Sequence, residues 1–239
     1  MNIELEQYDK DFIVENKKYI QSNNWDGFFK KLDRCSGDYI SASNVFEFCL
    51  ECVPDLMHKI TRLPNYAFEG SEIKNINIPS NITDIGNGTF SYCENLKKAY
   101  IPNTITKIGN YVFDGCKNLE SVIIPNNVTE IGENAFDNCV SLKKITIPDS
   151  VTKIGDYAFE GCRSLTNITI PDSVTRIGYK AFGYCESLTS ITIPDSVTRI
   201  GNELFEDNLN LKHISIPKHL KGRKFLKYIP WYCEVEVRS

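Results

Sequence analysis

Apolar positions return at a fixed interval along most of the chain. From Ile78 to Ser215 the sequence divides into six consecutive copies of a 23-residue unit, with no insertion or deletion between them. The copies begin at Ile78, Ile101, Ile124, Ile147, Ile170 and Ile193, and they share the pattern I-P-x-x-[VI]-T-x-I-G-x-x-[AV]-F-x-x-C-x-x-L-x-x-I-x. Because one such unit cannot bury its own apolar side chains, we expect successive units to stack as the coils of a solenoid.

The end of each unit predicts a short β-strand. In one copy, the segment from Leu165 to Ile170 alternates apolar and polar residues over its second half, which is the pattern of a strand with one buried face. Pro171 follows directly and ends the strand, because proline has no N–H to donate within a sheet. Asp172-Ser173 then predicts a turn, in which the side chains bond to local backbone.

The middle of the unit predicts a compact turn. Ile177, Ala181 and Phe182 are spaced by four and five residues, which is consistent with one helical or 3₁₀ turn packed over the core. Stacked units would then place Ile over Ile, Phe over Phe and Leu over Leu.

A column of cysteines follows the same interval. Its members are Cys93, Cys116, Cys139, Cys162 and Cys185, and the sixth copy carries Asn208 at this position. Coils about 4.8 Å apart would bring neighbouring thiols within bridging range, so a disulfide ladder is one interpretation. However, stacked side chains point the same way and five thiols is an odd number. We therefore predict packed free thiols.

This pattern resembles that of the BspA-type leucine-rich repeat proteins, whose tandem units have the form I-P-x-x-V-T-x-I-G-x-x-A-F-x-x-C-x-x-L-x-x-I. The resemblance covers about two-thirds of the chain. It implies an α/β-type repeat solenoid, which is a right-handed leucine-rich-repeat coil with a parallel β-sheet on one face. It also implies a binding role, because such proteins are mainly surface adhesins and interaction proteins of bacteria and some protists.

The patterns divide the chain into three parts. These are a small helical N-terminal cap domain at 1–59, the leucine-rich repeat solenoid at 60–217 (a partial copy at 60–77 and the six copies at 78–215), and a basic C-terminal cap at 218–239. The N-terminal part covers the open end of the repeat array, or it is a partner-binding module, and the two roles are compatible. In the tail, Trp231, Tyr232 and an alternating Glu-Val-Glu-Val strand are expected to close the last coil, and contact with an acidic partner is the alternative.

Helix boundaries in the N-terminal part follow from capping residues. Asn24 or Asp26 is expected to begin one helix, whose apolar residues recur at helical spacing. Ser41 or Ser43 is expected to begin another, which ends at Pro54.

Composition narrows the class of partner. The chain has 239 residues, 27 Lys and Arg against 31 Asp and Glu, and a formal net charge of −4. This charge argues against nonspecific nucleic-acid binding, and no apolar run reaches the about 18 residues that a membrane span needs, so neither nucleic acid nor a membrane is an expected partner. The early acidic residues, the lack of a signal-peptide core and the nine cysteines predict a cytoplasmic location, in the host cytoplasm if a phage or pathogen encodes the protein.

Motifs for catalysis are scarce. The glycines recur singly, the three histidines are scattered, and no Ser or Cys lies in a nucleophile-elbow context. One group has the residue types of zinc ligands or of a catalytic Cys–His pair: Cys35, Cys49, Cys52 and His58. Since Cys49 and Cys52 lie in an apolar, helical stretch, we interpret them as thiols of a helix core. We predict no catalytic residue, no metal, no cofactor and no enzymatic activity.

Departures from the repeat pattern indicate where a partner binds. Outward strand positions of the later copies are mostly Thr and Ser, whereas the earlier copies carry Lys98, Tyr100, Ile123 and Lys144. Exposed Tyr and Ile among lysines are typical of an interface hot spot. We predict these four residues as partner-binding residues, together with His213 in the same column as Lys98.

The predicted function is a non-enzymatic protein–protein interaction module. It acts inside the cell as an adaptor or inhibitor that occludes a partner protein. One form of this hypothesis is a phage or pathogen protein that targets a host defence or regulatory enzyme. The alternative is a cell-surface adhesin that binds host or matrix proteins. The identity of the partner and the oligomeric state stay open.

Overall fold

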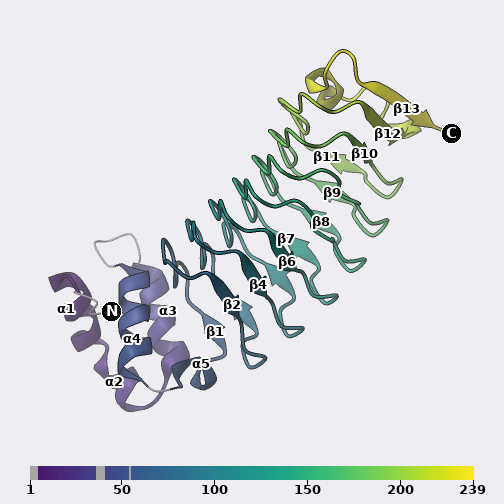
Figure 1. Ribbon diagram of the computed structural model, residues 1–239. Coiled ribbons are helices and arrows are strands. Elements are labelled where there is room, and N and C mark those ends of the chain that lie inside the picture. The colour runs from purple at the N-terminus through teal and green to yellow at the C-terminus, as the bar shows by residue number, and fades with distance from the viewer. Residues whose placement is uncertain (1–4, 36–40, 54) are drawn as a thin grey trace.

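The chain forms a parallel β-solenoid of about 8 turns, with helices at its N-terminal end and a short tail at the other (Figure 1). A computed structural model describes residues 5–35, 41–53 and 55–239. The fold class that the repeat predicts is confirmed. The successive coils lie side by side along one axis, so each residue of the repeat meets its counterparts in the coils before and after it.

One side of each coil contributes to a sheet face. Its strands are β2 (Asn75–Asn77), β4 (Lys98–Tyr100), β6 (Ser121–Ile123), β10 (Ser190–Thr192), β12 (His213–Pro217) and β13 (Glu234–Arg238). They pair in parallel in the orders β2-β4-β6 and β10-β12-β13, and a bridge joins Lys144 to Asn167 in the coils between. Residues along β4, β6 and β10 run exposed, buried, exposed, which confirms the alternation seen in the sequence.

A second row of parallel strands, which the sequence analysis did not predict, runs along the solenoid. Its strands are β1 (Arg62–Leu63), β3 (Asp84–Ile85), β5 (Lys107–Ile108), β7 (Glu130–Ile131), β8 (Lys153–Ile154), β9 (Arg176–Ile177) and β11 (Arg199–Ile200). Five of them form one sheet in the order β11-β9-β8-β7-β5. A glycine follows each of these five strands, and a Cβ on Gly178 would lie 2.4 Å from the backbone nitrogen of Asp156. Only glycine allows the coils to approach this closely.

The segment after this glycine is a series of tight turns. Glu160 N donates to the carbonyl of Tyr157 at 3.1 Å, which is the i→i−3 bond of a single 3₁₀-type turn, so the expected turn forms and is not extended into a helix. Tyr157 and Lys180 have φ of 57° and 49°, in the left-handed region that a helix excludes. The backbone N–H groups here bond between coils, as when Phe159 N donates to the carbonyl of Ala181 at 2.9 Å. These bonds between coils, together with the i→i−3 bonds of the turns, satisfy the buried backbone.

The hydroxyl of the Asp-Ser turn also bonds between coils. Ser173 Oγ donates to the carbonyl of Val151 at 2.7 Å, and Ser196 Oγ donates to that of Val174 at 2.7 Å. The turn lies where the sequence predicts it. Its serine, however, ties one coil to the preceding one, and the expected bond to local backbone is wrong.

Columns of stacked side chains build the core, and two of them are the phenylalanine and cysteine columns. Stacked rings with centroids 5.3 to 6.2 Å apart belong to Phe68, Phe90, Phe113, Phe136, Phe159, Phe182 and Phe205. The five cysteines of the predicted column are buried and free, which confirms the packed thiols. Each thiol donates to a phenylalanine carbonyl; Cys139 Sγ, for example, lies 3.2 Å from the oxygen of Phe113. Asn208 takes the same role, because its Nδ2 donates to the carbonyl of Phe182 at 2.8 Å.

Helices cover the N-terminal end of the solenoid, and five of them lie in the described residues (Figure 1). They are α1 (Gln7–Glu15), α2 (Lys17–Gln21), α3 (Trp25–Cys35), α4 (Ala42–Cys52) and α5 (Leu56–Lys59). Of the alternative capping residues, Asn24 accepts a bond from Gly27 N at 3.0 Å and Ser41 accepts one from Asn44 N at 3.3 Å. The ring of Phe46 meets that of Phe68 edge-on at 5.2 Å, so the helical core continues into the phenylalanine stack. Pro54 lies outside the described residues.

The tail closes the other end with two short helices. These are η1 (Lys218–Leu220) and η2 (Lys224–Tyr228), and they bury Leu220 and Phe225 over the last coil. The strand β13 pairs with β12, as the alternating tail predicts. Trp231 is 93% exposed, so its expected role in closing the coil is wrong. Leu220 and Phe225 already fill that end of the core, which leaves the indole outside.

Candidate functional site

The sheet face is the surface where departures from the repeat gather. Lys98 and Tyr100 lie on β4, and their register partners on β6 are Ser121 and Ile123. Tyr100 is 48% exposed and Ile123 is 64% exposed, although both are large and partly apolar. Because adjacent parallel strands lie about 4.8 Å apart, the two side chains are neighbours on the surface.

Lysines flank this apolar pair. Lys98 is exposed on β4, and Lys144 is exposed one coil beyond β6, in the same outward column. We call Lys98, Tyr100, Ile123 and Lys144 the N-terminal patch. The structure thus brings together four of the five residues that the sequence predicted, on three consecutive coils.

The fifth residue, His213, lies far from the others. It is on β12, five coils after Lys98, which is a separation of about 24 Å along the axis. Its ring nitrogens lie 3.7 Å from carboxylate oxygens of Glu234 and Glu236 on β13. His213 therefore belongs to a different part of the sheet face and cannot complete a single hot spot with the N-terminal patch.

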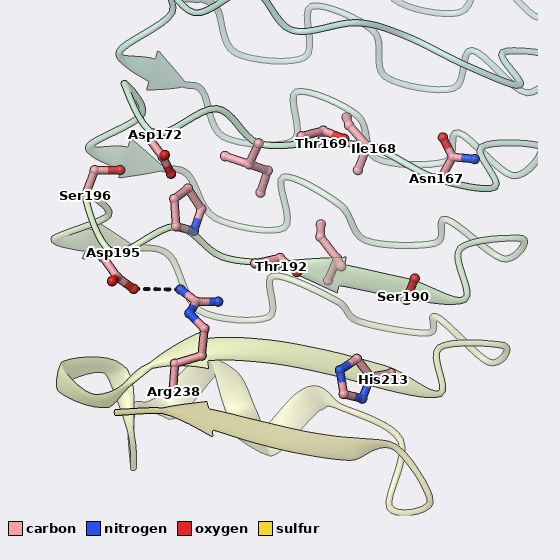
Figure 2. Close-up of a pocket in the computed structure, with 13 residues that line it drawn as sticks. Asn167, Ile168, Thr169, Asp172, Ser190, Thr192, Asp195, Ser196, His213 and Arg238 are labelled. Carbon is pink, nitrogen blue, oxygen red and sulfur yellow. Dashed lines mark hydrogen bonds and ion pairs between the residues drawn. The ribbon is translucent and has the colours of Figure 1, made fainter.

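A shallow hollow of about 790 Å³ occupies the later half of the same face (Figure 2). Thr169, Thr192 and Ile168 are among the strand residues that line it, and His213 and Arg238 lie toward its C-terminal side. The sequence analysis missed this hollow, because its strand positions are the Thr and Ser of the plain repeat. We call it the C-terminal hollow.

Arg238 crosses the edge of the C-terminal hollow. Its guanidinium donates to Asp195 Oδ1 at 2.7 Å, to the carbonyl of Ile193 at 2.5 Å and to Ser215 Oγ at 3.1 Å. Arg238 is 43 residues from Asp195 in the sequence, so no local pattern could have paired them. The pairing of β13 with β12 brings the two side chains together.

Charge changes sign along the face. The position after each strand proline is Ser or Asn in the first three copies, but it is exposed Asp149, Asp172 and Asp195 in the last three. The N-terminal patch is therefore cationic and apolar, whereas the later half is polar and acidic. Such a surface can recognise a partner by charge and by apolar contact.

The buried thiols do not add a reactive centre, whereas Cys52 is exposed, so its expected place in the helix core is wrong. Burial raises the pKa of Cys139 and Cys162 well above the ordinary value, and it raises the pKa of Cys185 to about 12. Burial and the nearby Cys52 raise the pKa of Cys49 to about 12. Thiols with such pKa values are poor nucleophiles near neutral pH.

Neither a cluster of metal ligands nor a membrane-spanning helix is found among the described residues. Within residues 5–35, 41–53 and 55–239, no three His, Cys, Asp or Glu side chains come together as metal ligands. Cys35, which belongs to the alternative zinc set, has its side chain outside the described part. Among the described helices, none is long and apolar enough to cross a bilayer.

Comparisons with known proteins agree with this geometry. The sequence matches the family described as BspA type leucine rich repeat region in six copies, over residues 40–166 and 129–229. The chain belongs to the BspA-type leucine-rich repeat family. Proteins with leucine-rich repeats are generally non-enzymatic binding modules. No curated protein matches the chain.

Solved structures with this repeat have the same fold. A leucine-rich repeat protein from Bacteroides ovatus is 31% identical with a TM-score of 0.66, over 75% of this chain and 47% of that one. This chain thus spans about half the length of that protein. The leucine rich repeat protein of T. pallidum is 26% identical with a TM-score of 0.60, over 74% and 91%. A leucine rich cell surface protein from Faecalibacterium prausnitzii, 24% identical with a TM-score of 0.50 over 76% and 52%, shows the fold alone.

Proposed function

We propose that this BspA-type leucine-rich repeat protein binds another protein through the N-terminal patch. It acts inside the cell as an adaptor or inhibitor that occludes its partner, and it carries out no catalysis. The observation that supports this most is the exposed pair of Tyr100 and Ile123 on adjacent strands, at 48% and 64%. The corresponding positions in the later copies are the Thr and Ser of the plain repeat.

The surroundings of the patch favour a hot spot. Its strand β4 pairs with β2 and β6 on its two sides, and the stacked core lies beneath, so little conformational entropy is lost on binding. Lys98 and Lys144 flank the apolar pair, which favours a partner surface with carboxylates around an apolar centre. Occlusion of a partner needs about 1,600 Å² of buried surface in total, which a sheet face of several coils can supply.

The test compares two double variants in affinity capture from the native cytosol. In Tyr100→Ala/Ile123→Ala the hot spot is removed, and capture of a specific partner should fall by at least about tenfold. In Thr169→Ala/Thr192→Ala the same kind of outward strand position changes in the later copies, and capture should be retained. A partner that binds the first variant as well as it binds the natural chain would place the site elsewhere.

The alternative function is a cell-surface adhesin. It is motivated by the family, among whose solved structures is one described as a leucine rich cell surface protein. Labelling of intact cells with a reagent that does not cross membranes decides between the two. A labelled chain would overturn the intracellular role, and a chain labelled only after lysis would support it.

A further inference from the structure

The C-terminal cap is strongly basic on an acidic protein. Residues 218–239 contain six Lys and Arg against two Glu, a net charge of +4, whereas the rest of the chain has 21 Lys and Arg against 29 Asp and Glu, a net charge of −8. The formal net charge of −4 is the sum of this basic segment and the acidic remainder of the chain. A local cationic surface of this kind attracts anions even when the whole molecule is acidic.

The fold places these cations on the outside of the cap. The apolar residues Leu220 and Phe225 of η1 and η2 point into the core, so the charged residues of the same segment remain in solvent. Five of them are exposed and have no ion pair with any described residue: Lys218, Lys221, Arg223, Lys224 and Lys227. The two acidic residues of the tail, Glu234 and Glu236, flank His213 on the sheet face instead.

Apolar and aromatic side chains project from the cap and from the last coil beside it. Trp231 is 93% exposed, Leu209 is 65% exposed and Tyr232 is 46% exposed. The Tyr232 hydroxyl donates to the carbonyl of Leu209, and the rings of Trp231 and Tyr232 lie 5.5 Å apart, so the three form one cluster. An exposed cluster with a tryptophan places a large apolar area in water, which is unfavourable. Closing the end of the solenoid does not need such a cluster.

We propose that this cap docks on the surface of an anionic phospholipid bilayer. Lysines and arginines near a bilayer are attracted by anionic headgroups, and tryptophan and tyrosine favour the region where headgroups meet acyl chains. A peripheral contact of this kind needs no spanning helix. It is compatible with partner binding on the sheet face and does not depend on it.

A bilayer fits the geometry better than a nucleic acid does. Proteins that hold single strands use a cationic groove in which bases stack on aromatic rings. Here Trp231 projects from the surface, at 93% exposure, and does not line the C-terminal hollow. The hollow beside the cations holds about 220 Å³ and is lined by Asn202, Arg223 and Lys224 among others, which is room for a headgroup phosphate.

The two tryptophans make a direct assay. Trp25 is 4% exposed within the helical cap, so a change of emission on addition of vesicles reports Trp231. The full chain is mixed with vesicles of phosphatidylcholine that contain phosphatidylserine, or with vesicles of phosphatidylcholine alone. We expect sedimentation with the anionic vesicles, a blue shift of the emission, and loss of both at high salt.

Matched variants place the contact. Lys224→Glu/Lys227→Glu should lower binding to the anionic vesicles by more than about tenfold, and Trp231→Ala should remove the blue shift. The control Lys10→Glu/Lys17→Glu makes the same change in net charge on the exposed surface of the helical cap and should bind like the natural chain.

Three results would overturn the proposal. The first is no sedimentation with anionic vesicles. The second is equal binding of Lys224→Glu/Lys227→Glu and its control. The third is a change of Trp231 emission when an oligonucleotide binds, with no change when vesicles are added. That result would make the cap a nucleic-acid-binding surface.

Discussion

A buried carboxylate beside the phenylalanine stack allows a quantitative test of the packing. Asp114 directly follows Phe113 of the stack and is 8% exposed, and the next coil places Asp137 at the same position with 9% exposure. Burial, and secondly the Asp137 carboxylate, raises the pKa of Asp114 from its ordinary 3.8 to about 6. The bond from the Tyr92 hydroxyl acts in the opposite direction and does not cancel the rise.

The direction of the effect on stability follows from this pKa. The folded chain holds the Asp114 proton more tightly than the unfolded chain does. The protonated carboxyl therefore stabilises the folded state fully below about pH 4, and this stabilisation is lost as the pH rises through about 6. Each unit of pKa difference corresponds to about 1.4 kcal/mol. The loss of unfolding free energy is therefore at most about 3 kcal/mol at about pH 8. About 1 kcal/mol of this is already lost at about pH 4.5.

The perturbation is Asp114→Asn, which keeps the shape and the acceptor oxygen for Tyr92 but cannot ionise. The free energy of unfolding is measured with urea at about pH 4.5 and about pH 8, for the variant and for the natural chain. Relative to the natural chain, the variant should gain about 2 kcal/mol of unfolding free energy between the lower and the higher pH. Asp149→Asn, at an exposed carboxylate of the sheet face, is the control.

A specific result would refute this reasoning. If the difference in unfolding free energy between Asp114→Asn and the natural chain is the same at both pH values, the carboxylate is not held in its protonated form. A larger advantage of the variant at the lower pH would reverse the sign and would contradict the burial that the structure gives to Asp114.

Three further predictions test the core and its hydrogen bonds. Phe136→Ala should lower the unfolding free energy by about 3–5 kcal/mol in a urea titration, because it leaves a cavity in the stack. Asn208→Ala should cost about 2 kcal/mol or more in the same titration, because it removes buried bonds to the backbone of Phe182 and Cys185, whereas Asn208→Cys restores a donor and should cost less. In native protein treated with iodoacetamide, mass spectrometry should find exposed Cys52 modified and the thiol column unmodified, because burial shields the column and raises the pKa of Cys116, Cys139, Cys162 and Cys185.

The sequence by itself determined the architecture of this protein. Ile, Phe, Cys and Leu recur at fixed places in a strict 23-residue interval, and the stacking of equal coils buries all of them. The alternation of apolar and polar residues also fixed which side chains of β4 and β6 face outward, so Tyr100 and Ile123 could be predicted as neighbours on the surface. Capping residues such as Asn24 and Ser41 marked helix starts, because their bonds are local.

Only the tertiary structure decided the features that depend on contacts between coils. The second row of strands is held by bonds to the coil before or after. The spacing within one unit therefore predicted the compact turn after Gly178 but not the strand that precedes it. The pairing of Arg238 with Asp195, and the exposure of Trp231, depend on how the tail lies across the last coil. A local sequence pattern indicates which side of a strand or helix is apolar, but it does not indicate which distant residue packs against that side.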